Sequence, residues 1–204
     1  MDPKSHWENI YQENNPDEVS WFQPRLAISL DLIKSVETRK DGPIIDIGGG
    51  ASTLIESLLS DGYINLSVLD ISGFALSRMK EKLKEKAAEI EWFETSILTF
   101  SPSKKFDLWH DRAVFHFLVN SNDRKKYLEN LKSHLNRNGH FIVATFSLDG
   151  PLQCSGLDVV RYDETSMKKE VGKDFELIKI CNEVHKTPWD SEQKFVYFLF
   201  RKIN

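Results

Sequence analysis

Two short motifs in the chain have the residue types that bind a nucleoside. Residues 43–48 (PIIDIG) form an Ile-rich run that contains Asp46 and ends in a turn with Gly48, Gly49 and Gly50. Glycines let the backbone turn tightly and approach a ligand closely, beside the positive N-terminal end of the helix that follows. The turn therefore predicts a ligand cradle at the end of a buried strand.

The second motif is Asp70, which ends the apolar run at residues 66–70 and is followed directly by Ile71. A carboxylate at the carboxyl end of such a strand can accept hydrogen bonds from both hydroxyls of a ribose. A tight turn beside an unrelated exposed aspartate is the simpler interpretation of either motif alone. Because strand, glycines, helix, strand and terminal aspartate occur in register, we predict a bound nucleoside.

These motifs lie within an alternation of predicted strands and helices. Ser52 or Thr53 and then Ser72 are candidate N-caps of two helices, and a third helix runs from about Asp123 to a stop with Gly139 at the C′ position. The alternation predicts a Rossmann-like, doubly wound α/β sheet, mostly parallel, with helices on both faces and an antiparallel last strand. We expect its seven strands at residues 43–48, 66–70, 90–94, 106–110, 140–147, 175–180 and 195–201.

Length and composition bound the organisation and the partners. We expect the 204 residues to form one domain, with an N-terminal aromatic lid and a leading helix over residues 1–40 and a cofactor-binding core over residues 41–204. The net charge of −4 provides no basic footprint, so nucleic acid is not an expected partner. No apolar run is long enough for a membrane span, and the start MDPKSHWENI has no signal core, which favours a cytoplasmic monomer or weak dimer. Cys154 and Cys181 lack C-x-x-C spacing and the histidines are scattered, so we expect no metal site.

The glycine turn departs from a dinucleotide fingerprint, because Thr53 stands where G-x-G-x-x-G requires glycine or alanine. The chain instead resembles the class I S-adenosylmethionine-dependent methyltransferases. IDIGGGAST is similar to the first glycine-rich motif of that superfamily, and Asp70 to its ribose-binding acid. The resemblance covers residues 40–204 and implies S-adenosylmethionine as cofactor, with S-adenosylhomocysteine as product.

Two further stretches narrow the resemblance. WHDRAVFHFL (residues 109–118) is similar to the thiopurine and tellurite-resistance methyltransferases. The N-terminal aromatic pattern is similar to that branch and to small lysine methyltransferases that act on a translation elongation factor. The resemblance implies cofactor contacts from Trp7, Tyr11, Trp21, Gly48, Asp70, Ser96, Ile97 and Arg112.

Elementary chemistry supports part of this list. Aromatic faces attract a cation such as a sulfonium by roughly 0.5–2 kcal/mol each, and Trp7 and Tyr11 share one side of a helix. Anchoring of the N-terminal arm is the competing role for the same rings. Asp111 and His116 are the candidate catalytic residues, because they follow the fourth strand where the acceptor should arrive. A surface ion pair of Asp111 with Arg112 or a helix cap is the alternative for the first position, and a satisfied core histidine is the alternative for His116.

We expect direct methyl transfer to an N, S or O nucleophile, which needs positioning and exclusion of water but no acid for the leaving group. A small-molecule acceptor is the first expectation, and a protein lysine is the alternative. A non-catalytic, nucleoside-binding regulatory module is the second alternative. A short-chain reductase is disfavoured, because Tyr162 is followed by Ser166 where Tyr-x-x-x-Lys requires a lysine.

Overall fold

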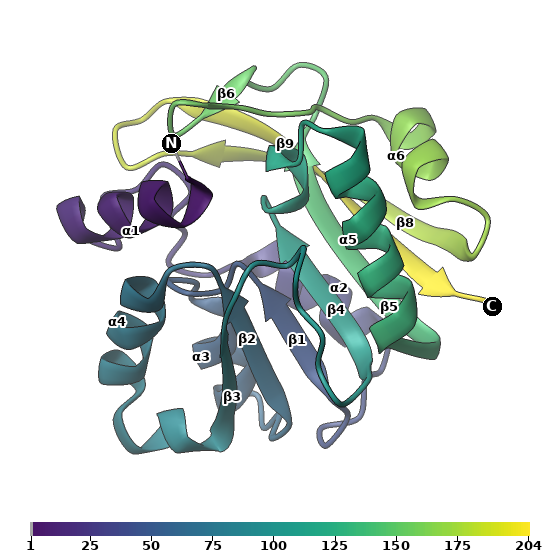
Figure 1. The fold of residues 1–204 in the computed structure, drawn as a ribbon, viewed down its shortest axis with the longest axis horizontal. Coiled ribbons are helices and arrows are strands. Elements are labelled where there is room, and N and C mark those ends of the chain that lie inside the picture. The colour runs from purple at the N-terminus through teal and green to yellow at the C-terminus, as the bar shows by residue number, and fades with distance from the viewer. Residues whose placement is uncertain (1) are drawn as a thin grey trace.

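The computed structural model describes residues 2–204, and its centre is a seven-stranded sheet in the order β3-β2-β1-β4-β5-β9-β8 (Figure 1). Strands β1 to β5 pair in parallel, whereas β9 runs antiparallel to both of its neighbours, β5 and β8. The predicted doubly wound sheet with an antiparallel last strand is therefore confirmed. The strands are β1 (Ile44–Ile47), β2 (Leu66–Asp70), β3 (Ile90–Glu94), β4 (Phe106–Arg112), β5 (Leu135–Phe146), β8 (Phe175–Lys186) and β9 (Glu192–Lys202).

Helices cover both faces of the sheet. The first layer consists of α2 (Ala27–Ser35), α3 (Leu54–Ser60) and α4 (Gly73–Leu83), and the second of α5 (Ser121–His134) and α6 (Glu164–Val171). Side chains alternate along each strand, so that in β1 Ile44 packs with the first layer and Ile45 with the second. The same alternation decides which polar residues at the strand ends face which side. Two short 3₁₀ helices, η1 (Lys84–Glu89) and η2 (Phe115–Phe117), complete the helical elements.

The N-terminal arm lies across the carboxyl edge of the sheet, where α1 (Pro3–Glu13) stands above the start of α4 (Figure 1). The Glu8 carboxylate accepts hydrogen bonds from the Ser72 hydroxyl (3.0 Å) and from the backbone N–H groups of Gly73 (2.8 Å) and Phe74 (3.2 Å). Glu8 thus caps the first turn of α4 and fixes α1 to it. No helix within residues 2–204 is long and apolar enough to cross a membrane.

The end of α5 differs from the prediction. The helix stops at His134, and Leu135 already pairs with Phe106 of β4, so Gly139 lies within β5 and not at a helix C′ position. Asn138 has a φ of +63°, and a Cβ on Gly139 would lie 2.8 Å from the Asn136 carbonyl oxygen. Close backbone approach in a turn of the strand, rather than helix capping, is the reason for this glycine.

One small hairpin was not predicted. β6 (Gln153–Cys154) pairs antiparallel with β7 (Leu157–Asp158). Its turn residues, Ser155 and Gly156, have φ values of +51° and +76°, as a two-residue hairpin turn of the mirror type requires. Strands of two residues carry too little periodic pattern to be recognised in the sequence.

Candidate functional site

A cavity of about 620 Å³ opens at the carboxyl ends of β1, β2 and β4. Five predicted residues line this cavity. Gly48 follows β1, Asp70 is the last residue of β2 and Ile71 follows it. Ser96 and Ile97 lie in the loop after β3. Open α/β sheets bind ligands at this edge, beside the point where the strand order reverses. Residues predicted from three separate loops are therefore brought to one hollow.

Asp70 holds the glycine turn in place. Its Oδ2 accepts a hydrogen bond from the Gly50 N–H (3.0 Å), and its Oδ1 accepts one from the Ser72 N–H (2.8 Å). A Cβ on Gly50 would lie 2.7 Å from this carboxylate, and a Cβ on Gly48, whose φ is +69°, would clash with Val114. The turn consequently requires glycine at both positions. Burial raises the pKa of Asp70 to about 6, although the N–H groups of Ser72 and Gly50 act to lower it.

Aromatic side chains of the N-terminal arm form the roof of the cavity. The ring centroid of Trp7 lies 5.7 Å from that of Trp21, 6.3 Å from that of Tyr11 and 5.1 Å from that of Phe117, which belongs to η2. All four rings also line the cavity. They therefore anchor the arm and at the same time line the cavity with aromatic surface.

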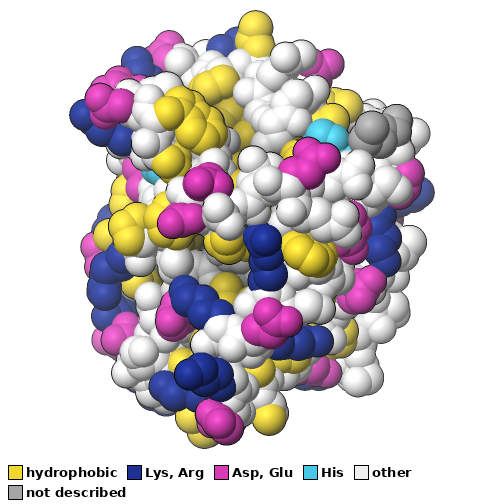
Figure 2. Space-filling model, turned by 90° about the vertical axis from the view of Figure 1, so that its left-hand side faces the viewer, with side chains coloured by type: hydrophobic (Ala, Val, Ile, Leu, Met, Phe, Trp, Pro, Cys, Tyr) yellow, Lys and Arg dark blue, Asp and Glu magenta, His cyan; other side chains and the backbone are white. Residues whose placement is uncertain are grey.

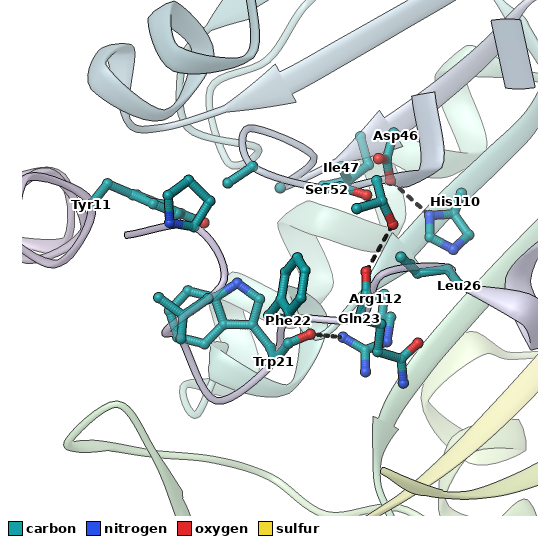
Figure 3. Close-up of a pocket in the computed structure, with 15 residues that line it drawn as sticks. Tyr11, Trp21, Phe22, Gln23, Leu26, Asp46, Ile47, Ser52, His110 and Arg112 are labelled. Atoms are coloured by element: carbon teal, nitrogen blue, oxygen red, sulfur yellow. Dashed lines mark hydrogen bonds and ion pairs between the residues drawn. The ribbon is translucent and has the colours of Figure 1, made fainter. Parts of the chain in front are cut away.

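A smaller recess of about 40 Å³ lies between the glycine turn and the arm (Figure 3). Asp46 and Arg112 line it, with side chains that are only 3% and 6% exposed. Among the residues that the structure describes, Asp46 Oδ2 and Arg112 Nη2 have no hydrogen-bond partner. Buried polar atoms are nearly always paired, so these two atoms are available for hydrogen bonds to a polar ligand in the recess.

The remaining nitrogens of Arg112 are held by the protein. Nε donates to the Tyr197 hydroxyl (3.0 Å), and Nη1 donates to the Trp21 carbonyl oxygen (3.1 Å). Nη2 lies 3.8 Å from the Glu183 carboxylate, and the guanidinium stacks over the Phe195 ring at 4.5 Å. Arg112 thus has a fixed orientation and joins the arm to β8 and β9.

Comparison with known proteins points to one family. Residues 45–141 match the family model described as a methyltransferase domain. Two curated relatives are the eEF1A lysine and N-terminal methyltransferase of Bos taurus, 22% identical over 121 residues, and EEF1A lysine methyltransferase 2 of Danio rerio, 24% identical over 163 residues. The matches cover 59% and 70% of this chain, but only 17% and 67% of the respective relatives.

Solved structures share the whole fold. The N-methyltransferase NodS from Bradyrhizobium japonicum, in complex with S-adenosylhomocysteine, superposes with a TM-score of 0.77 at 17% identity over 100% of both chains. The 1,6-didemethyltoxoflavin-N1-methyltransferase of Burkholderia thailandensis gives 0.75 at 15% identity over 98% of this chain and 87% of that one. The chain therefore shares the fold of these methyltransferases, and its residues 45–141 are similar to the methyltransferase domain family. The superfamily resemblance inferred from the glycine turn and Asp70 is confirmed.

Ten of the twelve predicted cofactor residues of this methyltransferase domain line the cavity or the recess, and Gly49 and Gly50 form the turn behind them. The ten are Trp7, Tyr11, Trp21, Asp46, Gly48, Asp70, Ile71, Ser96, Ile97 and Arg112.

Asp111 lines neither hollow, contrary to the expectation that it meets the acceptor. Strand alternation turns its fully buried side chain to the α5 face, opposite to that of its neighbour His110. There the carboxylate accepts hydrogen bonds from the N–H groups of Val114 (2.8 Å) and Phe115 (3.1 Å) and from the Tyr127 hydroxyl (2.6 Å). Burial raises the pKa of Asp111 to about 6. Asp111 therefore shapes the turn after β4 that lines the cavity.

His116 is a core residue and also lines neither hollow. Its ring is fully buried, and its Nδ1 accepts a hydrogen bond from the Phe146 N–H at 3.4 Å. Burial, with a smaller contribution from Arg112, lowers the pKa of His116 to about 3, so the ring is neutral at ordinary pH. A core histidine describes this position better than a catalytic base, but the ring is only partly satisfied, because Nε2 has no hydrogen-bond partner among the described residues.

The β6–β7 hairpin supplies further lining residues. Cys154, Leu157 and Asp158 line the cavity, together with Phe195 of β9. Burial raises the pKa of the Cys154 thiol, which keeps it protonated and unreactive. The hairpin therefore adds an apolar wall and one carboxylate to this end of the cavity.

Proposed function

We propose that the chain transfers the methyl group of S-adenosylmethionine to an amine nitrogen of a small molecule. The observation that carries the proposal is the pair of unpartnered buried atoms, Asp46 Oδ2 and Arg112 Nη2, beside the glycine turn. They match the ammonium and carboxylate of the amino-acid end of the cofactor. Asp70 matches the ribose hydroxyls, and Ile71, Ser96 and Ile97 surround the place left for the adenine.

The chain's residues act by position rather than by acid or base chemistry. S-Adenosylmethionine supplies the methyl group on a sulfonium, so the acceptor needs only a free lone pair aligned with it. Trp7, Trp21 and Phe117 close the cavity above and exclude water. Their faces favour a cationic sulfur over bulk solvent by roughly 0.5–2 kcal/mol each.

The charge of the cavity favours an amine. Its lining contains the carboxylates of Asp2, Asp70, Asp123 and Asp158, against the single guanidinium of Arg112. Such a lining attracts a protonated amine and repels an oxyanion. The bound amine releases its proton to water before its lone pair attacks the methyl group. The relatives and structures named above also carry nitrogen acceptors in their printed names.

A small molecule is the first choice of acceptor because a cavity of about 620 Å³ has the size that encloses one. The printed names of the curated relatives favour a protein lysine as the second choice. Figure 2 shows acidic and basic side chains interspersed over the face that carries α1 and α4, without a continuous basic track for nucleic acid on that face.

Calorimetry with S-adenosylhomocysteine, followed by transfer of labelled methyl groups into fractionated cell extract, tests the proposal. We expect binding, and label in amines of the small-molecule fraction. Asp70→Asn is the matched variant, since it keeps the shape of the side chain and should weaken the binding of S-adenosylhomocysteine and lower the transfer. Label confined to protein would make a protein lysine the first choice of acceptor. Binding of S-adenosylhomocysteine without any methyl transfer would favour the nucleoside-binding regulatory module.

A further inference from the structure

Three buried polar side chains form a continuous chain behind the recess. His110 Nδ1 lies 2.7 Å from Asp46 Oδ1, and His110 Nε2 lies 2.9 Å from the Ser29 hydroxyl (Figure 3 shows the first contact). The three come from β1, β4 and α2, and none is more than 2% exposed. Burial of polar side chains in an apolar layer costs free energy of folding, which hydrogen bonds between them must offset.

The sheet register explains how the chain forms. Asp46 and His110 are direct partners across β1 and β4 and project to the face covered by α2. With Nδ1 as donor, His110 donates a hydrogen bond to the Asp46 carboxylate and Nε2 accepts one from the hydroxyl of Ser29. Both ring nitrogens and the hydroxyl are thereby satisfied, and of the Asp46 carboxylate only Oδ2 is left free.

The arrangement is not a nucleophilic triad, although it contains serine, histidine and aspartate. Ser29 is fully buried and lines neither the cavity nor the recess, so no acceptor or acyl group can reach its hydroxyl. Asp46 and His110 both line the recess, and Asp46 Oδ2 is the atom there that has no hydrogen-bond partner among the described residues.

We infer that His110 and Ser29 are positioning residues that hold Asp46 in place for the ammonium group of the cofactor. The inference rests on the proposed cofactor site. Donation from His110 fixes the orientation of the carboxylate beneath the glycine turn. Ser29 in turn fixes the tautomer and plane of the imidazole, as second partners of histidines do in other sites.

The test compares two ligands in calorimetry. S-Adenosylhomocysteine contains the amino-acid end, whereas 5′-methylthioadenosine keeps the adenosine and the sulfur without it. His110→Leu removes the donor to Asp46, and His110→Asn places an amide nitrogen near the position of Nδ1. We expect His110→Leu to weaken S-adenosylhomocysteine about tenfold, which corresponds to about 1.4 kcal/mol, and to leave 5′-methylthioadenosine within about twofold. His110→Asn should recover most of the loss, and Ser29→Ala should lose about threefold for S-adenosylhomocysteine alone.

The outcomes separate this inference from the proposed function. Equal losses for both ligands would show that His110 only supports packing, and would overturn the inference. A wild-type protein that binds neither ligand would instead overturn the proposed function. If a thermal melt shows that His110→Leu does not fold, His110→Gln replaces it, because its longer amide reaches the position of Nε2 and not Asp46. Weaker binding of S-adenosylhomocysteine by His110→Gln than by His110→Asn supports the inference. Equal affinities of the two variants oppose it.

Discussion

The contact between Glu8 and the start of α4 should control how tightly the roof closes over the cavity. Glu8 accepts three hydrogen bonds, from the Ser72 hydroxyl and from the N–H groups of Gly73 and Phe74. The same helix, α1, carries Trp7 and Tyr11 into the roof. Replacement of Glu8 by alanine therefore weakens the attachment of α1 without touching a residue that lines the cavity.

The size of the effect follows from these contacts. Hydrogen bonds to a charged group contribute about 1.5–3 kcal/mol each when buried, and a carboxylate at a helix N-terminus about 0.3–1 kcal/mol. Glu8 is only half-buried and water can replace its bonds to the backbone, so we expect about 2 kcal/mol in total for Glu8→Ala. That value corresponds to a release of S-adenosylhomocysteine about thirtyfold faster.

Stopped-flow fluorescence can follow this release, because Trp7 and Trp21 line the cavity. Hydrogen exchange over residues 3–13 should increase in the same variant. Glu13→Ala is the matched control, since Glu13 is an exposed residue of the same helix. Identical release rates for the two variants would refute the idea that the Glu8 contact holds the roof closed.

Three further predictions concern buried ionisable groups. The pKa of Asp70 is about 6. S-Adenosylhomocysteine should therefore bind with constant affinity above that pH and more weakly below it, because protonation removes a hydrogen-bond acceptor. Calorimetry should show this pH dependence in the wild type and not in Asp70→Asn. Asp111→Asn should lower the free energy of unfolding by about 3 kcal/mol in denaturant titrations, because an amide cannot accept all three hydrogen bonds of the carboxylate, and a loss below about 0.5 kcal/mol would contradict its role in the turn. His116 has a pKa of about 3 in the folded state and 6.5 as its ordinary value, so the unfolded state binds the extra proton and stability falls as the pH drops through this window. Urea titrations at several pH values should show a shallower fall for His116→Leu, and an unchanged slope would refute the assignment.

Local signals were sufficient to predict the sheet and half of the site. The Ile-rich run before the glycine turn and the run that ends in Asp70 each contain their own strand, turn and cap information. Ser72 is found as the N-cap of α4, with its hydroxyl accepting from the Ala75 N–H, as predicted. Such features depend on residues within one turn of each other, so no tertiary information is needed to find them.

The candidate catalytic residues illustrate what local signals cannot decide. Asp111 and His110 are neighbours in sequence, yet strand alternation sends them to opposite faces, one to the turn above α5 and one to Asp46. The sequence shows that alternate residues of β4 lie on opposite faces of the sheet. Which of the two sets faces the ligand depends on the pairing of β4 with β1. The end of α5 was mispredicted for a related reason, since pairing of Leu135 with β4 outweighs the glycine signal downstream.

The recess shows why the remainder of the site is a property of the folded chain alone. Arg112 Nη2 has no hydrogen-bond partner among the described residues, whereas the Tyr197 hydroxyl and the Trp21 carbonyl hold the other two nitrogens. The segment around Trp21 is bound to β8 on both sides of this residue. Gln23 donates a hydrogen bond to Glu183, and His185 forms one with the Ser20 carbonyl oxygen. The position of the N-terminal arm and the orientation of Arg112 are consequently coupled. A variant that detaches the arm should also increase the mobility of the residues that line the recess. A ligand that engages both Asp46 and Arg112 would in turn stabilise the closed arm, since binding and closure are thermodynamically linked.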